Sequence, residues 1–404
     1  MKNKEISFSP PNIQDEDIEQ VINVLKSGWI TTGQVTKKFE KALANYIGND
    51  KVVGLSSCTA ALEMTLRILG IGKGDEVIVP AYTYTATAAA VHHVGAKIVM
   101  IDIQQDNYEM DYNAISEKIT PNTKAIIPVD IAGKPCDYKK IYEIIENKKD
   151  IFKSKGKLQQ LFNRIIIVAD AAHSFGAEYN GVKSGNYADF TCFSFHAVKN
   201  LTTGEGGAVT WKNNPLLDNE KIYNQFMLHS LHGQSKDALS KSKAGQWEYD
   251  IIEPLYKANM TDIQAAIGHS QLKRYDKTLK RREEIINLYN TFLRSEYIKP
   301  IQHFENNRNS SGHLYIINID GIYQNKRDFI IEQMSKKGIA CNVHYKPLPL
   351  LTAYKELGFV IDQFPNSFKM FQNEITLPLH TKLTDDDIHY ISDTLLGIIK
   401  ELRH

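Results

Sequence analysis

The chain has 404 residues, of which 42% are hydrophobic, and its 48 basic residues balance 47 acidic ones. This length suits one large domain with a smaller one. The formal net charge of +1 argues against nucleic acid as the main partner, because phosphate backbones attract a strong basic excess. The chain start lacks the apolar run of a signal peptide, and the longest apolar stretches are far shorter than a membrane span. We therefore expect a cytoplasmic protein with no membrane partner.

Segments with helical and strand patterns alternate through the first half of the chain. Residues 15–28 and 36–48 have apolar residues at helical spacing, and each segment ends in a glycine suited to a helix C-cap. A short strand at 51–57 and a helix at 58–70 follow. The next strands are Val- and Ile-rich runs expected at 75–80, 96–102, 124–130 and 164–170. Their alternation with helices predicts a parallel α/β sheet.

The pattern changes after residue 210. Residues 241–260 are polar and aromatic without clear periodicity, which suggests a long functional loop. Residues 261–293 are expected to form a long helix interrupted near Gly268. A smaller α+β domain follows, so we place a large domain at 1–285 and a small domain at 286–404. Its strand, helix and strand are expected at 311–319, 329–338 and 339–345.

Two polar features follow predicted strands at the sheet edge where open parallel sheets bind ligands. Small hydroxyl residues open a helix within "SSCTAAL" (56–62), and free N–H groups there suit a phosphate, although an ordinary N-cap explains the same pattern. Asp170 comes just past a buried strand, with His173 three residues on. A buried carboxylate needs a partner, and a capping role for Asp170 is the competing interpretation.

The third feature is the strand and turn at 189–200, which carries Ser194, His196 and Lys199. Lys199 follows Asp170 by 29 positions (199 − 170), enough for one more strand, so both lie at one sheet edge if their strands are neighbours. A phosphate cradle, a carboxylate and a lysine are what pyridoxal phosphate requires: a Schiff-base lysine, an acid that keeps the ring nitrogen protonated, and a phosphate site.

Other interpretations of this region are weaker. The segment "TTGEGG" (202–207) lacks the lysine and hydroxyl residue that end a P-loop. Its glycines are expected to let the backbone pass close to the cofactor. His92 and His93 lie in an apolar helix without acidic neighbours, and the four cysteines have no paired spacing, so we expect no metal site and no disulfide.

From "SGWITTGQVTKKFEKALANYIG" to "LPLHTKLTDDDIHYI" the chain resembles the DegT/StrS family of sugar aminotransferases, which have the aspartate aminotransferase fold, fold type I. The matching motifs include "DAAHSFGA", "FSFHAVKNLTTGEGG", "YKANMTDIQAAIG" and "NVHYKPLPL". This resemblance implies a mostly parallel seven-stranded sheet flanked by helices, a smaller C-terminal α+β domain, pyridoxal 5'-phosphate as cofactor, and a homodimer with shared active sites.

The resemblance also implies residue roles. Lys199 is the implied catalytic Schiff-base lysine, and Asp170 the partner of the ring nitrogen. The other implied cofactor contacts are Thr59, Ala60, Ser194 and Asn259 at the phosphate (Asn259 from the neighbouring subunit), Tyr84 stacked on the ring, and His173 near the phenolic oxygen. The implied substrate contacts are Thr31, His344 and Tyr345. The family often has glycine in place of Cys58 and glutamine in place of His173, while His196 has no implied role.

Relatives that dehydrate sugars carry histidine in place of this lysine, so Lys199 favours transamination. The implied reaction moves an amino group from L-glutamate to a nucleotide-linked keto-sugar, with Lys199 shuttling the proton as an uncharged amine. "FHAVKN" and "YKANMTDIQAAI" are most similar to enzymes that aminate C4 of UDP-linked sugars. The main alternative is a C3 aminotransferase of a dTDP-linked 3-keto-6-deoxy sugar; a sugar dehydratase and a non-catalytic cofactor-binding regulator are less favoured.

Overall fold

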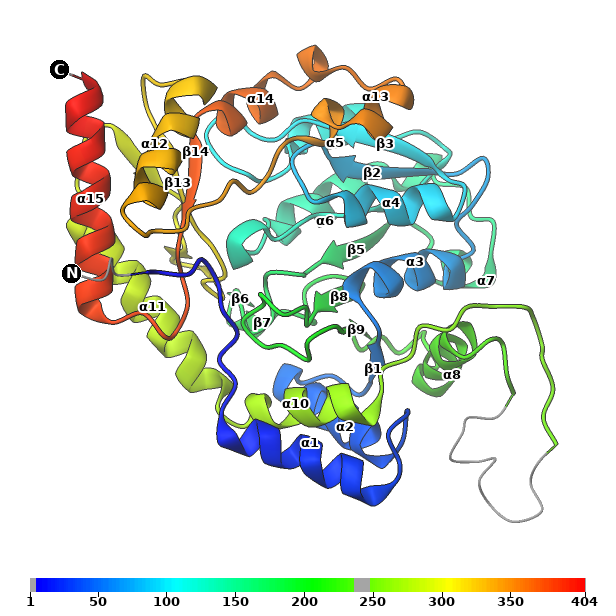
Figure 1. Cartoon of the computed structure of the whole chain (residues 1–404). Helices are drawn as coiled ribbons and strands as arrows, with labels where there is room; N and C mark the ends of the chain where they lie inside the picture. Colours follow the sequence, from blue (N-terminus) through cyan, green and yellow to red (C-terminus); the bar gives the residue numbers. More distant parts are fainter. Residues whose placement is uncertain (1–4, 236–247, 404) are drawn as a thin grey trace.

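The computed structural model describes residues 5–235 and 248–403. A seven-stranded sheet in the order β1-β9-β8-β5-β4-β2-β3 forms the centre of the large domain (Figure 1). Strand β9 is antiparallel to both neighbours, and the remaining strands run parallel to one another. The predicted mostly parallel α/β sheet is therefore confirmed. Its strands are β1 (Val52–Leu55), β2 (Glu76–Pro80), β3 (Lys97–Ile101), β4 (Thr123–Ile126), β5 (Ile166–Asp170), β8 (Phe190–Ser194) and β9 (Gly207–Trp211).

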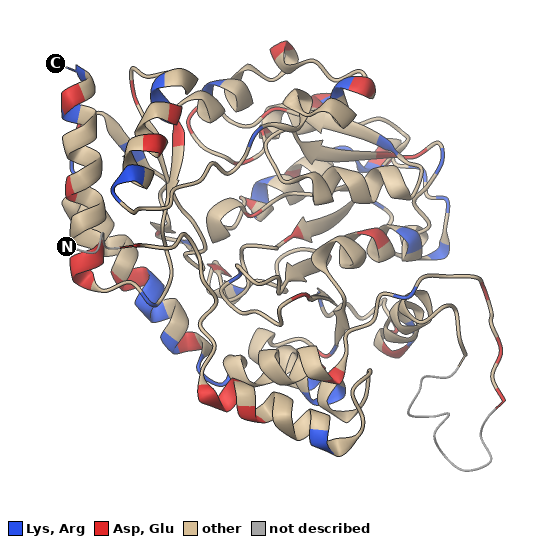
Figure 2. Ribbon diagram, in the orientation of Figure 1, with Lys and Arg blue, Asp and Glu red and all other residues tan. Residues whose placement is uncertain are grey.

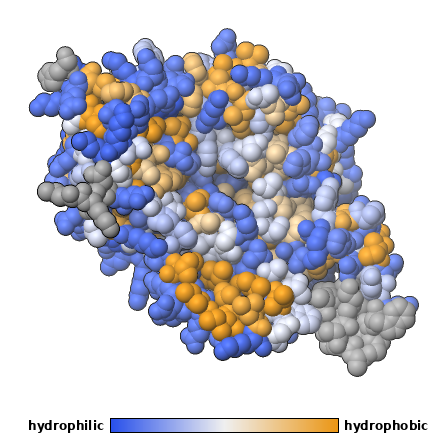
Figure 3. Space-filling model, in the orientation of Figure 1, coloured by the Kyte–Doolittle hydropathy of each residue, from blue (hydrophilic) through white to orange (hydrophobic). Residues whose placement is uncertain are grey.

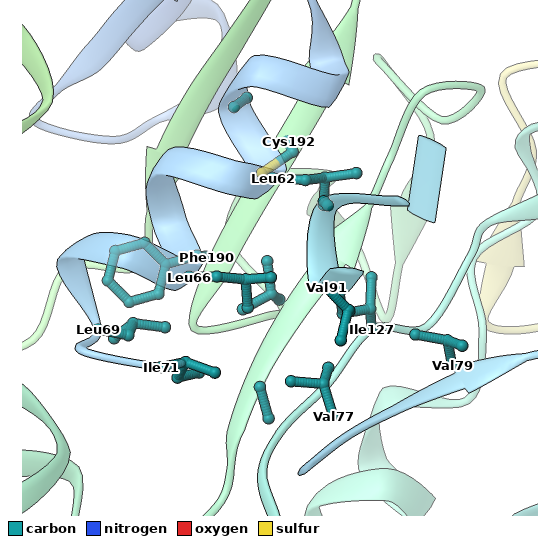
Figure 4. Packing of buried hydrophobic residues seen from close by; sticks show 14 of the residues in the cluster. Leu62, Leu66, Leu69, Ile71, Val77, Val79, Val91, Ile127, Phe190 and Cys192 are labelled. Carbon is teal, nitrogen blue, oxygen red and sulfur yellow. The ribbon is translucent and has the colours of Figure 1, made fainter. Parts of the chain in front are cut away.

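Successive side chains of the central strands enter two separate cores, because side chains alternate between the faces of a sheet. In β2, Val77 and Val79 belong to one apolar cluster and Ile78 to the other. The first core includes Leu62 and Leu66 of α3, seen in Figure 4 beside the strand residues. Helices on both faces explain why the strands are continuous apolar runs. These helices are α3 (Cys58–Ile68) and α4 (Thr85–His93) on one face, with α5 (Tyr112–Lys118) and α6 (Tyr138–Asn147) on the other.

A helical layer packs against the β1 side of the large domain (Figure 1). The two predicted N-terminal helices end at glycines in the left-handed region, Gly28 at φ 74° and Gly48 at φ 88°. The expected interruption of the helical run at 261–293 exists, but it lies at residues 273–274, between α10 (Asp262–Leu272) and α11 (Tyr275–Phe292), and not at Gly268. Gly268 lies inside α10, where an added Cβ would meet the ring of Phe39 at 2.5 Å. The layer contains α1 (Asp15–Ser27), α2 (Gln34–Ile47) and α10, and α11 continues from it.

The small domain packs three antiparallel strands against helices that include α11. The expected strand at 339–345 is wrong: Ile339 and Asn342 make only isolated bridges, to Ile6 and Thr376. The expected domain boundary, between residues 285 and 286, falls in the middle of helix α11. The small-domain core contains Ile285 from this helix and also Ile6 from the N-terminal segment. The other elements of this domain are β10 (Ile298–Pro300), β13 (Tyr315–Ile319), β14 (Glu374–Leu377), α12 (Gln324–Lys336) and α15 (Asp385–Arg403).

A small four-stranded sheet joins the two domains, because a hairpin that follows β5 pairs with a hairpin of the C-terminal part. Its strands are β6 (Glu178–Tyr179), β7 (Val182–Lys183), β11 (Phe304–Glu305) and β12 (Arg308–Asn309). The outer helices are α7 (Lys157–Phe162), α8 (Asn219–Ser230), α13 (Thr352–Glu356) and α14 (Pro365–Gln372). In Figure 2 basic and acidic residues are interspersed on the outer helices, as the near-zero net charge leads one to expect. Within the described ranges, no helix has the length and apolarity that a membrane crossing requires.

Candidate active site

Asp170 and the turn that carries Lys199 follow two neighbouring strands. Asp170 ends β5, and its register partner in the parallel strand β8 is Cys192. The chain then leaves β8 after Ser194 and turns, with the N–H of Lys199 donating to the carbonyl of His196 at 2.9 Å. The expectation that both residues lie at the carboxyl edge of adjacent strands is met.

Lys199 has an amine that is easily deprotonated for a lysine. Burial lowers the pKa of Lys199 to about 8, and the negative charge of Asp170 opposes that shift without cancelling it. At neutral to mildly alkaline pH a substantial fraction of the amine is therefore uncharged. An uncharged amine is both a nucleophile and a base, which are the two properties that a carbonyl-binding lysine needs.

Asp170 is a buried acceptor for several donors. It is 5% exposed, and its Oδ2 accepts the hydroxyl of Thr87 at 2.7 Å. Its Oδ1 accepts the backbone N–H of Ala172 at 3.2 Å and the thiol of Cys58 at 3.7 Å. Burial raises the pKa of Asp170, while these hydrogen bonds and the charge of Lys199 oppose the rise. A buried carboxylate of this kind suits a cationic ring N–H.

The N-terminus of α3 lies at the same sheet edge. The Oγ of Ser57 accepts the N–H of Ala60 at 3.0 Å, so the amide of Ala60 is already engaged in an N-cap. Thr59 lies in the same first turn, where backbone N–H groups and the helix dipole favour an anion. Ser194 is half-buried at the end of β8, and its Oγ accepts the N–H of His196 at 3.3 Å. These groups form the part of the edge where a phosphate fits.

Gly207 brings β9 against this helix start. A Cβ at Gly207 would lie 2.4 Å from the carbonyl carbon of Ser57 and 2.5 Å from the nitrogen of Cys58. The close approach that this glycine permits is therefore between β9 and the first turn of α3. The expectation that the glycines of 202–207 let the backbone pass close to the cofactor stays a prediction.

A histidine and a tyrosine from different domains are in contact near Asp170, whose charge acts on the tyrosine. The Nδ1 of His173 accepts the N–H of Ala132 at 3.2 Å, and its Nε2 lies 3.0 Å from the phenol oxygen of Tyr345. Burial lowers the pKa of His173 well below its usual value, so the ring is neutral. Since a backbone N–H can only donate, Nδ1 is bare and Nε2–H donates to Tyr345. The ring of Tyr84, which is 60% exposed, lies 5.8 Å from that of Tyr345.

The whole region that carries these residues matches a known protein family. The model of the DegT/DnrJ/EryC1/StrS aminotransferase family matches residues 11–396. The chain belongs to the DegT/DnrJ/EryC1/StrS aminotransferase family. It is 41% identical to the protein MJ1066 of Methanocaldococcus jannaschii (98% of this chain and 99% of that protein are covered). It is 34% identical to the spore coat polysaccharide biosynthesis protein SpsC of Bacillus subtilis (99% and 98% covered).

A solved structure of the family has almost the same backbone. Spr1654 from Streptococcus pneumoniae, assigned as a sugar aminotransferase, is 50% identical to this chain and superposes with a TM-score of 0.96, covering 99% of this chain and 98% of that one. It has been solved in PMP and PLP forms. Aminotransferases of the DegT/StrS family depend on pyridoxal 5'-phosphate. The donor set described above fits this cofactor, with a lysine amine, a buried carboxylate for the ring nitrogen and a helix N-terminus for the phosphate.

Other predicted residues lie at varied distances from this centre. Asn259 forms a bridge with Leu55, directly before the α3 segment, and its amide contacts Thr32 and Lys257 of the same chain. Thr31 is exposed, and its carbonyl accepts the N–H of Asp262 at 3.1 Å. The loop expected beside the site falls partly on residues 241–247, outside the described residues.

His93 and His196 lie beside acidic side chains. His93 has an acidic partner after all, since its Nδ1 lies 2.9 Å from Glu63. No three His, Cys, Asp or Glu side chains gather at a metal-binding spacing in the described part of the chain. The exposed side chain of His196 lies 3.6 Å from Glu205. The cysteines of the described chain are free thiols, and three of the four are buried.

Sequence reasoning missed two residues at the site. Thr87 lies in the alanine-rich helix α4, and only the packing of that helix beside β5 brings its hydroxyl to Asp170. The ring of His313 lies 4.4 Å from that of His173, with the two planes tilted by 45°, and its Nδ1 lies 3.0 Å from the amide oxygen of Asn200, next to Lys199. Neither has a local sequence pattern that signals a site. Both positions follow from contacts between distant segments.

Proposed function

We propose that the chain transfers the amino group of L-glutamate to a keto-sugar linked to a nucleotide, as a pyridoxal-phosphate-dependent aminotransferase. The observation that carries this proposal is the pKa of Lys199, which burial lowers to about 8. The negative charge of Asp170, at the carboxyl edge of β5 and β8, acts on the same amine. When bound, the cofactor supplies an electron sink for the bonds broken at the amino-acid α-carbon. Asp170 would hold its ring nitrogen, and Thr59 and Ser194 its phosphate, with the N–H of Ala60 exchanging the Oγ of Ser57 for a phosphate oxygen.

Lys199 moves the proton in both halves of this reaction. Its uncharged Nζ takes a proton from the α-carbon of glutamate and later delivers one to the sugar carbon that receives the amino group. The neutral ring of His173 and the phenol of Tyr345 form the wall on the small-domain side, with Tyr84 across from Tyr345. His344 and Tyr345 are the proposed substrate contacts of that domain. Asn259 is proposed to serve the phosphate of the neighbouring subunit.

The sugar is the least constrained part of the proposal. The name of SpsC connects it with spore coat polysaccharide, and Spr1654 is assigned to sugar transamination; both cover nearly the whole of this chain. We propose a 4-keto sugar on UDP as the acceptor, in the synthesis of a surface polysaccharide. Incubation with glutamate and a panel of UDP- and dTDP-linked 4-keto and 3-keto sugars, read by mass and NMR, tests this. If only the dTDP-linked 3-keto sugars were aminated, the proposed site of amination would be C3 and not C4.

A homodimer is proposed as the working state. Large apolar side chains on α1 are exposed, among them Ile18 (50%), Ile22 (42%) and Leu25 (53%), at the helical spacing of one face. Figure 3 shows a wide apolar area over the part of the molecule where Figure 1 places α1. An apolar area of this kind on a chain with balanced charge indicates a protein interface. A second copy of the chain is the partner that we propose for it.

A further inference from the structure

One hydroxyl lies between a carboxyl group and an imidazole at the side of the small-domain sheet. The Oγ1 of Thr376, in β14, is 2.5 Å from Oε1 of Glu374 and 3.0 Å from Nδ1 of His344. The other carboxyl oxygen of Glu374, Oε2, accepts the backbone N–H of His344 at 3.0 Å. Glu374 and Thr376 are both 0% exposed, so bulk water does not compete for these contacts.

The hydroxyl of Thr376 has a single proton, so it donates to one of its two neighbours and accepts from the other. An ionised Glu374 can only accept. Thr376 then donates to Glu374 and accepts Nδ1–H of His344, which leaves Nε2 as a bare acceptor. A neutral Glu374 carries its proton on Oε1, because Oε2 already accepts the N–H of residue 344. Thr376 then accepts that proton and donates to Nδ1, so Nε2 of His344 carries the ring hydrogen.

We propose that Thr376 couples the charge state of Glu374 to the tautomer of His344, and thereby determines whether His344 offers the substrate a hydrogen-bond donor or an acceptor. Glu374 and Thr376 are positioning residues in this proposal. The nitrogen that changes is at the site, since the charge of Lys199 acts on the His344 ring and that ring lies 4.9 Å from Tyr345. No hydrogen bond from the described residues occupies Nε2.

The ligand class for this nitrogen follows from the two tautomers. With Nε2–H, His344 binds an oxygen that can only accept, such as a keto oxygen or a sugar ring oxygen. With bare Nε2, it binds a group that must donate, such as a hydroxyl or an amine. A keto-sugar acceptor and its amino product differ in this property. The role toward the sugar rests on the proposed function, whereas the coupling between Glu374 and His344 is a property of the protein alone.

The surroundings of Glu374 favour its neutral form near neutral pH. Burial raises the pKa of Glu374 to about 8, against the opposing effects of its two hydrogen bonds and of Arg327 on α12. Burial lowers the pKa of His344 to about 3, so the ring stays neutral while Glu374 titrates. Raising the pH through 8 therefore moves the ring proton from Nε2 to Nδ1. The other titratable groups facing Glu374 are Tyr82, Tyr108, Tyr345 and Cys341, and burial keeps each of them protonated by raising its pKa.

The test is the ring tautomer of His344 in holoenzyme made with ¹⁵N-labelled histidine, read by long-range ¹H–¹⁵N correlation, with the signal assigned by its loss in His344→Gln. We expect the wild type to carry the proton on Nε2 at about pH 7 and on Nδ1 at about pH 9, one unit on either side of the titration. Glu374→Gln points an amide N–H at Thr376 while its oxygen accepts the N–H of residue 344. It should hold the Nε2–H tautomer at both pH values.

Two variants of the hydroxyl complete the design. Thr376→Ser keeps the hydroxyl and should reproduce the wild-type pH response, whereas Thr376→Val should abolish it. We also expect Thr376→Val to raise KM for the sugar nucleotide about tenfold, the effect of one lost hydrogen bond. The visible absorption of the lysine-bound cofactor should be unchanged in both variants. This control would show that each variant folds and binds the cofactor.

The coupling is wrong if wild type and Glu374→Gln show the same His344 tautomer at both pH values, or if Thr376→Val responds to pH like the wild type. These spectra need no sugar, so they can contradict the coupling while the sugar panel supports the aminotransferase. Conversely, a correct pH response with no amination of any sugar in the panel would leave the coupling standing and remove the proposed substrate class.

Discussion

Tyr345 of the small domain and His173 of the large domain are joined by a hydrogen bond of 3.0 Å between the phenol oxygen and Nε2. Because Nδ1 of His173 is occupied by the N–H of Ala132, the imidazole is the donor in this bond. The phenol accepts it and keeps its own proton for another acceptor. The two domains are thus connected by this bond, and among the described residues no further partner is found for the proton of the Tyr345 phenol.

Replacing Tyr345 by Phe removes an acceptor from a buried imidazole N–H. We expect a loss of about 1–3 kcal/mol in the free energy of unfolding, because a buried donor without a partner loses its hydration and gains nothing in return. Urea unfolding of the holoenzyme measures the change. Tyr323→Phe, at a tyrosine that is 68% exposed, is the matched control and should change stability by less than about 0.5 kcal/mol. Equal effects of the two variants would contradict the bond.

Activity should rise with pH through the titration of Lys199. Since burial lowers the pKa of Lys199 to about 8, the charged and inactive form dominates below that pH and the uncharged base above it. We expect kcat for the half-reaction with glutamate to increase about tenfold per pH unit below the titration and to level off above it. Stopped-flow absorption of the cofactor over a pH series measures this.

Lys199→Ala is the test of the residue itself. Borohydride reduction followed by peptide mass spectrometry should find the cofactor attached at Lys199 in the wild type, and no attachment in this variant. Lys346→Ala removes an exposed lysine beside Tyr345 and serves as the control, with attachment at Lys199 unchanged. Attachment at a different lysine in the wild type would contradict the assignment.

Thr87→Val removes one hydrogen bond from the buried carboxylate of Asp170 without changing the shape of the side chain. The hydroxyl donates to Oδ2 at 2.7 Å, and bonds to charged acceptors contribute about 1.5–3 kcal/mol. We therefore expect affinity for pyridoxal phosphate to fall by roughly ten- to a hundredfold, measured by fluorescence titration of the apoenzyme. Thr87→Ser retains the donor and should bind almost as the wild type does. If Thr87→Ser lowered the affinity for pyridoxal phosphate as much as Thr87→Val does, the loss would come from packing and not from the hydrogen bond.

The sequence was enough to predict that Asp170 and Lys199 lie at the same edge of the sheet, because both follow the ends of strands that can be located from the sequence. Apolar runs mark parallel strands, and parallel strands place their following residues at one edge. Glu374 and Thr87 could not be found in this way, since their partners lie 30 and 83 positions distant in the chain. The loop at 339–345 was expected as a strand from its apolar residues, but its neighbours in space offer only two isolated bridges. The local pattern of apolar and polar residues does not show which distant segments of the chain come into contact.

Gly268 explains why the interruption of the 261–293 helix was placed too early in the chain, and it supplies a stability prediction. A glycine inside a helical pattern suggests a break, yet here it allows α10 to lie against Phe39 and Thr203, whose atoms would be 2.5 and 2.8 Å from an added Cβ. Gly268→Ala should cost about 1–3 kcal/mol by overpacking. Gly397→Ala, in helix α15 with no atom within 4 Å of an added Cβ, should instead stabilise by up to about 1 kcal/mol. Urea midpoints of the two variants should move in opposite directions.

The exposed face of α1 gives a prediction about assembly. If a second copy covers Ile22, then Ile22→Glu places a charge in an apolar interface and should shift the protein from dimer to monomer, because a buried charge without a partner is costly. Sedimentation velocity measures the shift. Leu357→Glu changes an equally exposed apolar residue, 48% against 42%, on α13's C-terminal side, and should leave the dimer intact. Since Asn259 is proposed to reach the neighbouring site, the monomer should also lose cofactor. A wild-type monomer that binds pyridoxal phosphate and transaminates would contradict both parts.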